Sequence, residues 1–354
     1  MLLNIQALRA LAAFLVVFVH LEALAARAGL GPQAMRFGNS GVDLFFVISG
    51  MIMVVTTANG ETGAGRFFRH RIVRIAPFYW AMTFAVFAVA AFAPQLVQAT
   101  RADPLDLIKS LLFIPFVKAN GLTQPVVFVG WSLNYEMAFY VVFALGLLTR
   151  RRALGLALCC AALAMAVTAG LGLSPKDPIG AFYTSPIMLE FALGIGIGWL
   201  LPRLSPPPGA ALPAMAAGFC AFCLMLAGPS LWPELDRLVM FGLPAAVIVV
   251  AALVLERAGK IVRTPLIKAL GDASYAIYLT HFFVTQAVIK AFAALKLEGP
   301  LAAGLAALLT FVLVAIVGLL AHRLIEAPLT RVTRGWLTPP RPVSSTAGPR
   351  RQAT

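Results

Sequence analysis

The chain has 354 residues, of which 60% are hydrophobic and 12% are charged, and its mean hydropathy is +0.89. Soluble domains are about 45–50% apolar and about 25% charged, so this composition excludes an ordinary soluble protein. The net charge of +14 could suit nucleic acid, but the cationic residues lie in short segments between apolar runs, as topology signals do. The apolar runs fill the chain and predict one membrane domain over residues 1–330.

In chain order, ten apolar runs are close to the length of about 20 residues that a helix needs to cross a bilayer. They lie near residues 4–25, 38–58, 77–94, 131–149, 153–172, 184–201, 209–228, 238–255, 274–295 and 301–325. The predicted fold class is therefore an all-α integral membrane protein, with about ten transmembrane helices in a single polytopic bundle. Segments 103–117 and 263–273 are shorter and more polar, and are predicted to lie along the membrane interface. Residues 335–354 are predicted to be a disordered cytoplasmic tail.

The lysine and arginine residues predict the orientation of these spans. Eighteen of the 28 fall on one side of the predicted membrane and eight on the other, while Arg9 and Lys290 lie inside spans. The positive-inside rule places the richer side, with both termini, in the cytoplasm. We therefore expect a multi-pass protein of the plasma (inner) membrane.

Two short patterns resemble known sites but have simpler explanations. Cys220 and Cys223 have CxxC spacing, yet no other Cys and no nearby His completes a set of ligands, so no metal site is predicted. The glycines of "LGIGIG" (193–198) follow no strand and lie in an apolar run. Helix packing through small residues is the expected role of these glycines.

Ionisable residues inside the spans indicate where chemistry takes place, because each is costly within a bilayer. His20 lies late in an outward-running span, while Asp43 and Glu136 lie early in inward-running spans. These three groups are thus predicted at one depth in the outer half, where Asp43 or Glu136 could orient the His20 imidazole as a base. A structural hydrogen bond between helices is the alternative role for either carboxylate.

Arg9 and His20 are predicted to share one helix face, because eleven residues make almost three turns. Their axial separation is about 16 Å. A cation near the cytoplasm and an imidazole deeper in the bilayer would line a groove suited to a long anionic donor such as acyl-coenzyme A. Alternatively, Arg9 extends to the interface and His20 is an ordinary residue of the bundle.

The other histidines are predicted to lie elsewhere. His70 and His322 fall at the cytoplasmic side, and His281 lies about two turns in from that side. This leaves His20 as the histidine of the outer half.

Six motifs in order resemble the membrane acyltransferase-3 family. They are "NIQALRALAAFLVVFVH" (4–20), "SGVDLFFVISG" (40–50), "RHRIVRIAPFYW" (69–80), "WSLNYEMAFY" (131–140), "SYAIYLTH" (274–281) and "HRLIEAP" (322–328). The "LNYEM" segment is most similar to the branch of exopolysaccharide and succinoglycan O-acetyltransferases. Two departures are that Glu136 stands alone where many relatives have two adjacent acids, and that Ala10 replaces a frequent glycine.

The resemblance implies acyl transfer from cytoplasmic acyl-coenzyme A, with acetyl-coenzyme A favoured, and no permanently bound cofactor. The acceptor would be a hydroxyl of an exopolysaccharide, a lipopolysaccharide or a lipid-linked sugar. His20 would be the catalytic base or a transient acyl carrier, and Arg9, Arg71 and Arg74 would hold the donor. For the arginines, topology and anionic lipid are the alternative explanation.

Further polar residues in the motifs could line the substrate cavity. They are Ser132, Tyr275, Tyr278 and His281. Hydrogen bonding between helices is the alternative for each.

A polytopic transporter or an export-complex subunit for a polysaccharide precursor is the second functional reading. Buried carboxylates would suit a proton-coupled carrier. However, the sequence lacks a pair of Gly/Pro-broken spans in corresponding halves, which is the usual pattern of such carriers.

Overall fold

In a computed structural model of the chain, the described residues are 2–31, 33–58, 63–97, 100–149 and 151–337. They are mostly helical, and their β-structure consists of an isolated bridge between Val117 and Thr123. Within these ranges, nine helical runs are long and apolar enough to cross a membrane. The predicted all-α polytopic bundle is confirmed.

The nine long runs coincide with nine of the ten predicted spans. In chain order they are η1–α3 (Arg36–Asn39, Ser40–Thr56), α4 (Ala64–Phe92), η3–α6 (Phe128–Gly130, Trp131–Gly146), α7 (Arg152–Leu173), α8–η4–α9–η5 (Pro178–Tyr183, Pro186–Met188, Leu189–Leu200, Leu201–Arg203), α10 (Ala211–Leu231), η6–α11 (Leu238–Gly242, Leu243–Arg257), α13 (Ser274–Ala294) and α14–η7–α15 (Gly299–Ala321, His322–Glu326, Ala327–Leu337). Helix α4 begins thirteen residues before the predicted span, so its arginines are helical. Residues 335–337 of the predicted tail end α15, and 338–354 lie outside the described residues.

The first predicted span is shorter than expected. Helix α1 (Leu3–Val19) has 17 residues, the chain turns at His20 and Leu21, and α2 (Glu22–Arg27) follows. The two segments predicted at the interface contain short helices, α5 (Pro104–Leu111) and α12 (Pro265–Asp272).

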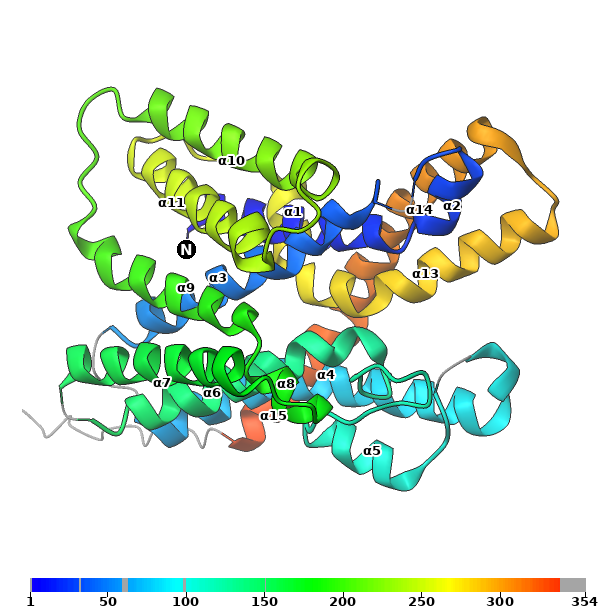
Figure 1. Cartoon of the computed structure of the whole chain (residues 1–354), viewed down its shortest axis with the longest axis horizontal. Helices are drawn as coiled ribbons and strands as arrows, with labels where there is room; N and C mark the ends of the chain where they lie inside the picture. The colour runs from blue at the N-terminus through cyan, green and yellow to red at the C-terminus, as the bar shows by residue number, and fades with distance from the viewer. Residues whose placement is uncertain (1, 32, 59–62, 98–99, 150, 338–354) are drawn as a thin grey trace, which may run out of the picture.

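The helices form two groups that lie one above the other in Figure 1. Helices α1, α3, α9, α10, α11, α13 and α14 form the upper group, and α4 to α8 with α15 form the lower group. Helix α1 contacts α3, α11, α12 and α13, which makes it the centre of the upper group. Residues on α1 can therefore reach several elements at once.

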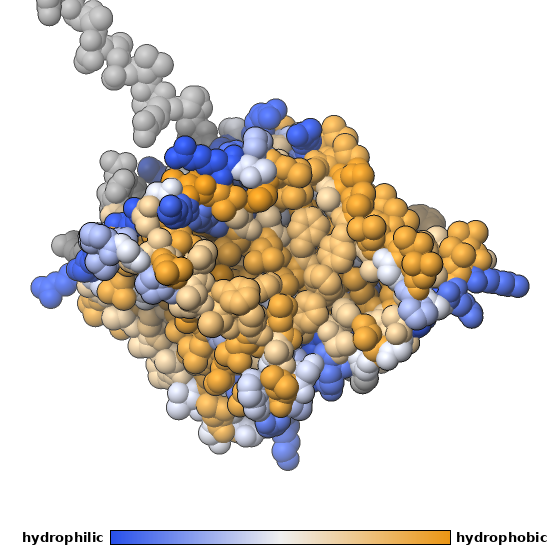
Figure 2. Space-filling model, turned by 90° about the horizontal axis from the view of Figure 1, so that it is seen from above, coloured by the Kyte–Doolittle hydropathy of each residue, from blue (hydrophilic) through white to orange (hydrophobic). Residues whose placement is uncertain are grey.

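The surface of this bundle is mostly apolar. Figure 2 shows a broad hydrophobic face with hydrophilic residues gathered at its margins. Exposed large side chains include Leu171 on α7, Phe219 on α10 and Leu308 on α14, each more than 60% exposed. An exposed apolar surface of this extent suits contact with lipid rather than with water.

Two glycines allow α3 and α9 to pack backbone to backbone. A Cβ atom on Gly194 would lie 2.2 Å from the Val47 carbonyl oxygen, and one on Gly50 would lie 2.3 Å from that of Phe191. Small residues at such crossings permit close approach inside a membrane. The packing role predicted for "LGIGIG" is confirmed for Gly194, whereas Gly196 has no neighbour within 4 Å of the Cβ position.

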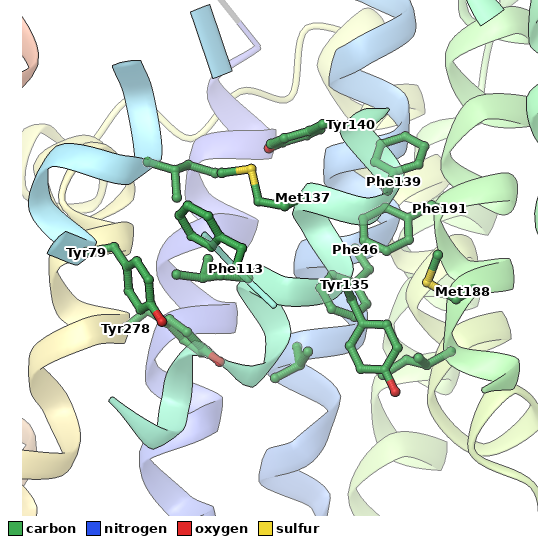
Figure 3. Packing of buried hydrophobic residues seen from close by; sticks show 14 of the residues in the cluster. Phe46, Tyr79, Phe113, Tyr135, Met137, Phe139, Tyr140, Met188, Phe191 and Tyr278 are labelled. Carbon is green, nitrogen blue, oxygen red and sulfur yellow. The ribbon is translucent and has the colours of Figure 1, made fainter. Parts of the chain in front are cut away.

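Stacked aromatic rings tie this crossing to α6. The Phe191 ring lies 4.4 Å from Phe46 of α3 and 4.3 Å from Phe139 of α6, centroid to centroid. Figure 3 shows these three rings side by side in the buried core. The stack fixes α6, and with it Glu136, against α3.

We predict that Gly194→Ala destabilises the bundle while Gly196→Ala, two residues along the same helix, does not. Overpacking a tight contact costs about 1–3 kcal/mol, and the Gly194 contact is with rigid backbone. Thermal unfolding of the two variants in detergent, followed by size-exclusion chromatography, measures the difference. Equal melting temperatures would contradict the backbone contact between α3 and α9.

Candidate active site

A cavity of about 180 Å³ lies inside the bundle, among α1, α3, α4, α6 and α13. Its polar lining consists of Arg9, Ser49, Arg71, Arg74, Ser132, Glu136, Tyr140, Ser274, Tyr275 and Tyr278. Seven residues selected from the sequence thus line one cavity. Apolar side chains from α3, including Phe45 and Ile52, form much of the remaining wall. The cavity can hold an anionic group at its arginines and an apolar group beside α3.

Arg9 is a cation of this cavity with a neutral hydrogen-bond partner. Its Nη1 donates to Gln6 Oε1 at 3.2 Å, one turn earlier on α1. Within the described part of the chain, no ion pair joins Arg9 to an acid. A guanidinium inside a membrane bundle is costly unless it is paired, so a bound anion would stabilise this arrangement.

Arg71 and Arg74 contribute from adjacent turns of α4. The Arg71 guanidinium lies over the Phe67 ring at 5.6 Å and donates weakly to Thr56 Oγ1 at 3.4 Å. Arg74 is already paired, because its Nη1 lies 2.7 Å from Oε1 of the fully buried Glu326. Arg71 is therefore free to reach an anion, whereas Arg74 also joins α4 to η7.

Glu326 is held from a second side by the helix that carries it. His322 Nδ1 lies 2.8 Å from Glu326 Oε2, four residues apart in the π-helical segment η7. Glu326 thus joins His322 to Arg74. This network fixes one wall of the cavity.

Glu136 faces the arginines rather than His20. Its Oε1 accepts a hydrogen bond from Ser49 Oγ at 3.0 Å and another, unusually short, from the Tyr140 hydroxyl. Tyr140 lies four residues further on α6, so it shares a helix face with Glu136. Both donors stabilise a carboxylate in a cavity that otherwise carries positive charge.

Ser132 and Tyr278 close the cavity at the end nearest His20. Their hydroxyls lie 2.7 Å apart, and the Tyr278 hydroxyl also donates to the Val129 carbonyl oxygen at 2.8 Å. At the opposite wall, the Tyr275 hydroxyl donates to the Ile75 carbonyl oxygen at 2.8 Å. These residues both line the cavity and bond between helices, so the two roles predicted for them are combined.

His20 lies beyond this end, half-buried among aromatic rings. The Phe128 and Phe282 rings stand edge-on to it, with centroids at 5.4 and 5.3 Å, and the His281 ring lies at 5.1 Å. The predicted continuous groove from Arg9 to His20 is thus interrupted. Tyr278 lines the cavity and contacts His281, which in turn contacts His20.

A pinned loop carries Phe128 to this position. Lys118 Nζ donates to the Val126 carbonyl oxygen at 3.2 Å and to Thr100 Oγ1 at 2.9 Å, and the Val126 amide donates to Ser110 Oγ at 2.9 Å. Burial lowers the pKa of Lys118 to about 8. The loop therefore has a fixed course immediately before η3, which keeps Phe128 against His20.

Asp43 is paired with an arginine from another helix. Arg237 forms a two-point ion pair with it, Nε to Oδ1 at 3.0 Å and Nη2 to Oδ2 at 2.8 Å. No hydrogen bond or ion pair in the described ranges joins His20 to Asp43 or to Glu136. An equal depth in the membrane does not determine the direction in which each side chain points. Helix packing directs the Asp43 side chain toward η6.

His281 also lies elsewhere than its position along the span indicated. Its ring is beside His20, although it was expected near the cytoplasmic end of its helix. Helix α12 explains the difference: a Cβ on Gly271 would lie 2.3 Å from the Gln6 carbonyl oxygen, so α12 packs against α1. Helix α13 thus begins inside the bundle, and its eighth residue reaches the level of His20.

Comparison with known proteins identifies the chain. A family model described as an acyltransferase domain, that of acyltransferase family 3, matches residues 2–321. The chain belongs to the acyltransferase-3 family. It is 37% identical over 300 residues to the exopolysaccharide production protein ExoZ of Rhizobium meliloti, covering 83% of this chain and 90% of that protein. It is also 26% identical over 335 residues to the acyltransferase MdmB of Streptomyces mycarofaciens, covering 83% and 81%. No solved structure matches.

The family resemblance drawn from the six motifs is confirmed. The protein is a membrane acyltransferase that transfers acyl groups other than aminoacyl groups. Four residues of this acyltransferase-3 protein were missed in the sequence: Ser49, Phe128, Tyr140 and Arg237. The spacing of Tyr140 from Glu136 was a usable signal. The costly Asp43 carboxylate was another, because it required a cation, and Arg237 lies directly before the span that begins at Leu238.

We predict that Asp43→Asn in this acyltransferase weakens folding. Removing one partner of a buried ion pair leaves the other unpaired, which costs about 3 kcal/mol. Thermal unfolding in detergent measures the loss, and the double variant Asp43→Asn/Arg237→Gln should recover part of it. An Asp43→Asn protein as stable as the wild type but without turnover would instead support a catalytic carboxylate.

Proposed function

We propose that the protein is a plasma-membrane O-acyltransferase that moves an acyl group, acetyl being favoured, from cytoplasmic acyl-coenzyme A to a hydroxyl of an exported glycan. The observation that supports this most is Arg9. This arginine has no acidic ion-pair partner among the described residues, shares a cavity of a membrane bundle with Arg71, and lies on the helix that ends directly before His20.

The arginines favour a phosphorylated donor. Guanidinium groups bind phosphate oxygens bidentately, and such charge-assisted bonds are stronger than neutral ones. Arg9 and Arg71 would hold phosphates of coenzyme A, while Arg74 keeps the wall in place through Glu326. His20 lies about 16 Å further along α1, a span that a long, flexible pantetheine arm suits.

The glycan acceptor is proposed from the relatives and from the orientation. ExoZ is named for exopolysaccharide production, and the motifs resemble the branch that acetylates such polymers. The uneven distribution of Lys and Arg favours cytoplasmic termini, with His20 toward the outer face. An exopolysaccharide, a lipopolysaccharide or a lipid-linked sugar would meet His20 from that side.

His20 would act as the base for this transfer. The acceptor oxygen attacks the thioester carbonyl carbon while a His20 nitrogen takes the hydroxyl proton. The carbon–sulfur bond then breaks, and the proton passes to the coenzyme A thiolate. The unperturbed pKa of histidine, about 6.5, suits proton transfer near neutral pH. If His20 instead carries the acyl group, its nitrogen attacks first and the hydroxyl displaces it.

We predict that His20→Ala loses at least about 100-fold in turnover, because general base catalysis contributes about 10²–10⁴-fold. Transfer of labelled acetyl from acetyl-coenzyme A to envelope glycan, in membranes that express the variant, measures this. His70→Ala is the matched control, since His70 is exposed on α4 and does not line the cavity.

Membranes with His20→Ala that still acylate glycan at the wild-type rate would contradict this function. Loss of glycan export together with acylation would favour the transporter reading. We expect acylation to fail while export continues.

A further inference from the structure

His281 has a ring nitrogen that the fold leaves without a partner. The side chain is fully buried, and its Nδ1 lies 2.6 Å from the Tyr278 carbonyl oxygen. Its Nε2 is buried and has no hydrogen-bond partner among the described residues. Buried polar atoms are nearly always hydrogen-bonded, and leaving one unmatched costs about 1–3 kcal/mol. This nitrogen therefore indicates an interaction that remains to be identified.

The bond at Nδ1 determines what Nε2 requires. A carbonyl oxygen can only accept, so Nδ1 carries the hydrogen and donates it. In a neutral imidazole the other nitrogen then holds a lone pair and accepts. The missing partner of Nε2 is consequently an N–H or O–H donor.

His20 is the donor placed to supply this bond. Its ring centroid lies 5.1 Å from that of His281, and nitrogens that face each other across such a gap come within hydrogen-bonding distance. Tyr278 also contacts His281, but its hydroxyl hydrogen goes to the Val129 carbonyl oxygen. Phe128 and Phe282, which flank His20, carry no polar hydrogen.

We propose that His281 is the positioning residue of His20, a role that rests on the proposed acyl transfer. By a small rotation of the His20 ring, one of its nitrogens donates to His281 Nε2, which leaves the other nitrogen unprotonated to take the acceptor's hydrogen. His281 thus does what a carboxylate does in other acyl-transfer sites.

A neutral partner suits this location. The surroundings are aromatic, and an additional buried carboxylate would be costly there. The two carboxylates expected to orient His20 are committed to Arg237 and to the Ser49 and Tyr140 hydroxyls. The imidazole acceptor still stabilises the imidazolium that forms when His20 takes a proton.

Nitrogen-15 NMR of histidine-labelled protein in lipid bilayers tests this directly, because the chain has four histidines. We expect His281 to be protonated at Nδ1 with a hydrogen-bonded, unprotonated Nε2, and His281→Phe to change the tautomer balance of His20. Spectra of His20→Asn and His281→Phe provide the assignments. An unchanged His20 signal in His281→Phe would overturn the proposal.

Kinetics give a second readout. His281→Phe keeps the ring but loses the acceptor, so kcat for acetyl transfer from acetyl-coenzyme A should fall about ten- to a hundredfold, with the donor KM unchanged. His281→Gln, whose carbonyl oxygen replaces Nε2, should recover much of the loss. Thr285→Val is the control, because the Thr285 hydroxyl donates to the His281 carbonyl oxygen and leaves the imidazole untouched.

The two proposals fail in different ways. Full activity of His20→Ala would remove the proposed function itself. A strong loss in His20→Ala together with full activity in His281→Phe would overturn the positioning role and leave the function standing. If His281→Phe folds poorly, the wild-type NMR spectrum and the His281→Gln rates still test the positioning role of His281.

Discussion

The positive charge of Arg9 inside an apolar bundle is the constraint on which the rest of the site depends. The described part of the chain offers it Gln6 as a hydrogen-bond partner and no acid as an ion-pair partner. An anion bound from outside the protein would stabilise a charge in this situation. The cavity beside it also contains Arg71 and the paired Arg74, so positive charge gathers at this end of the site.

Helix α1 connects Arg9 to the other end of the site. It contacts α3, α11, α12 and α13, and glycines at the crossings bring neighbouring backbones close. Arg9 lies on this helix and His20 directly follows its last residue, so the helix sets the separation between the two side chains. The far end differs in character, since His20 is surrounded by Phe128, Phe282 and His281 rather than by charges. The fold thus places the arginines at one end of the site and His20 with His281 at the other.

The sequence predicted the bundle well, because lipid requires long apolar helices and the spans can be read from hydropathy. It also selected Arg9, Arg71 and Arg74 as one group, and the three line one cavity, but it placed Glu136 with His20 whereas Glu136 lines the cavity of the arginines. Charge placement along a span gives depth, whereas the direction of a side chain depends on how helices rotate against one another. For that reason the Asp43–Arg237 ion pair was missed. The entry of α12 against α1, which raises His281 to the level of His20, depends on a glycine contact that hydropathy does not report.

Binding of coenzyme A to the purified protein in lipid nanodiscs tests the central claim most directly. Isothermal titration would compare the wild type with Arg9→Gln, and with Arg27→Gln on the exposed end of α2 as the control. A charge-assisted hydrogen bond is worth about 1.5–3 kcal/mol, so Arg9→Gln should weaken binding roughly ten- to a hundredfold while Arg27→Gln has no effect. Equal dissociation constants for all three proteins would contradict a donor site at Arg9.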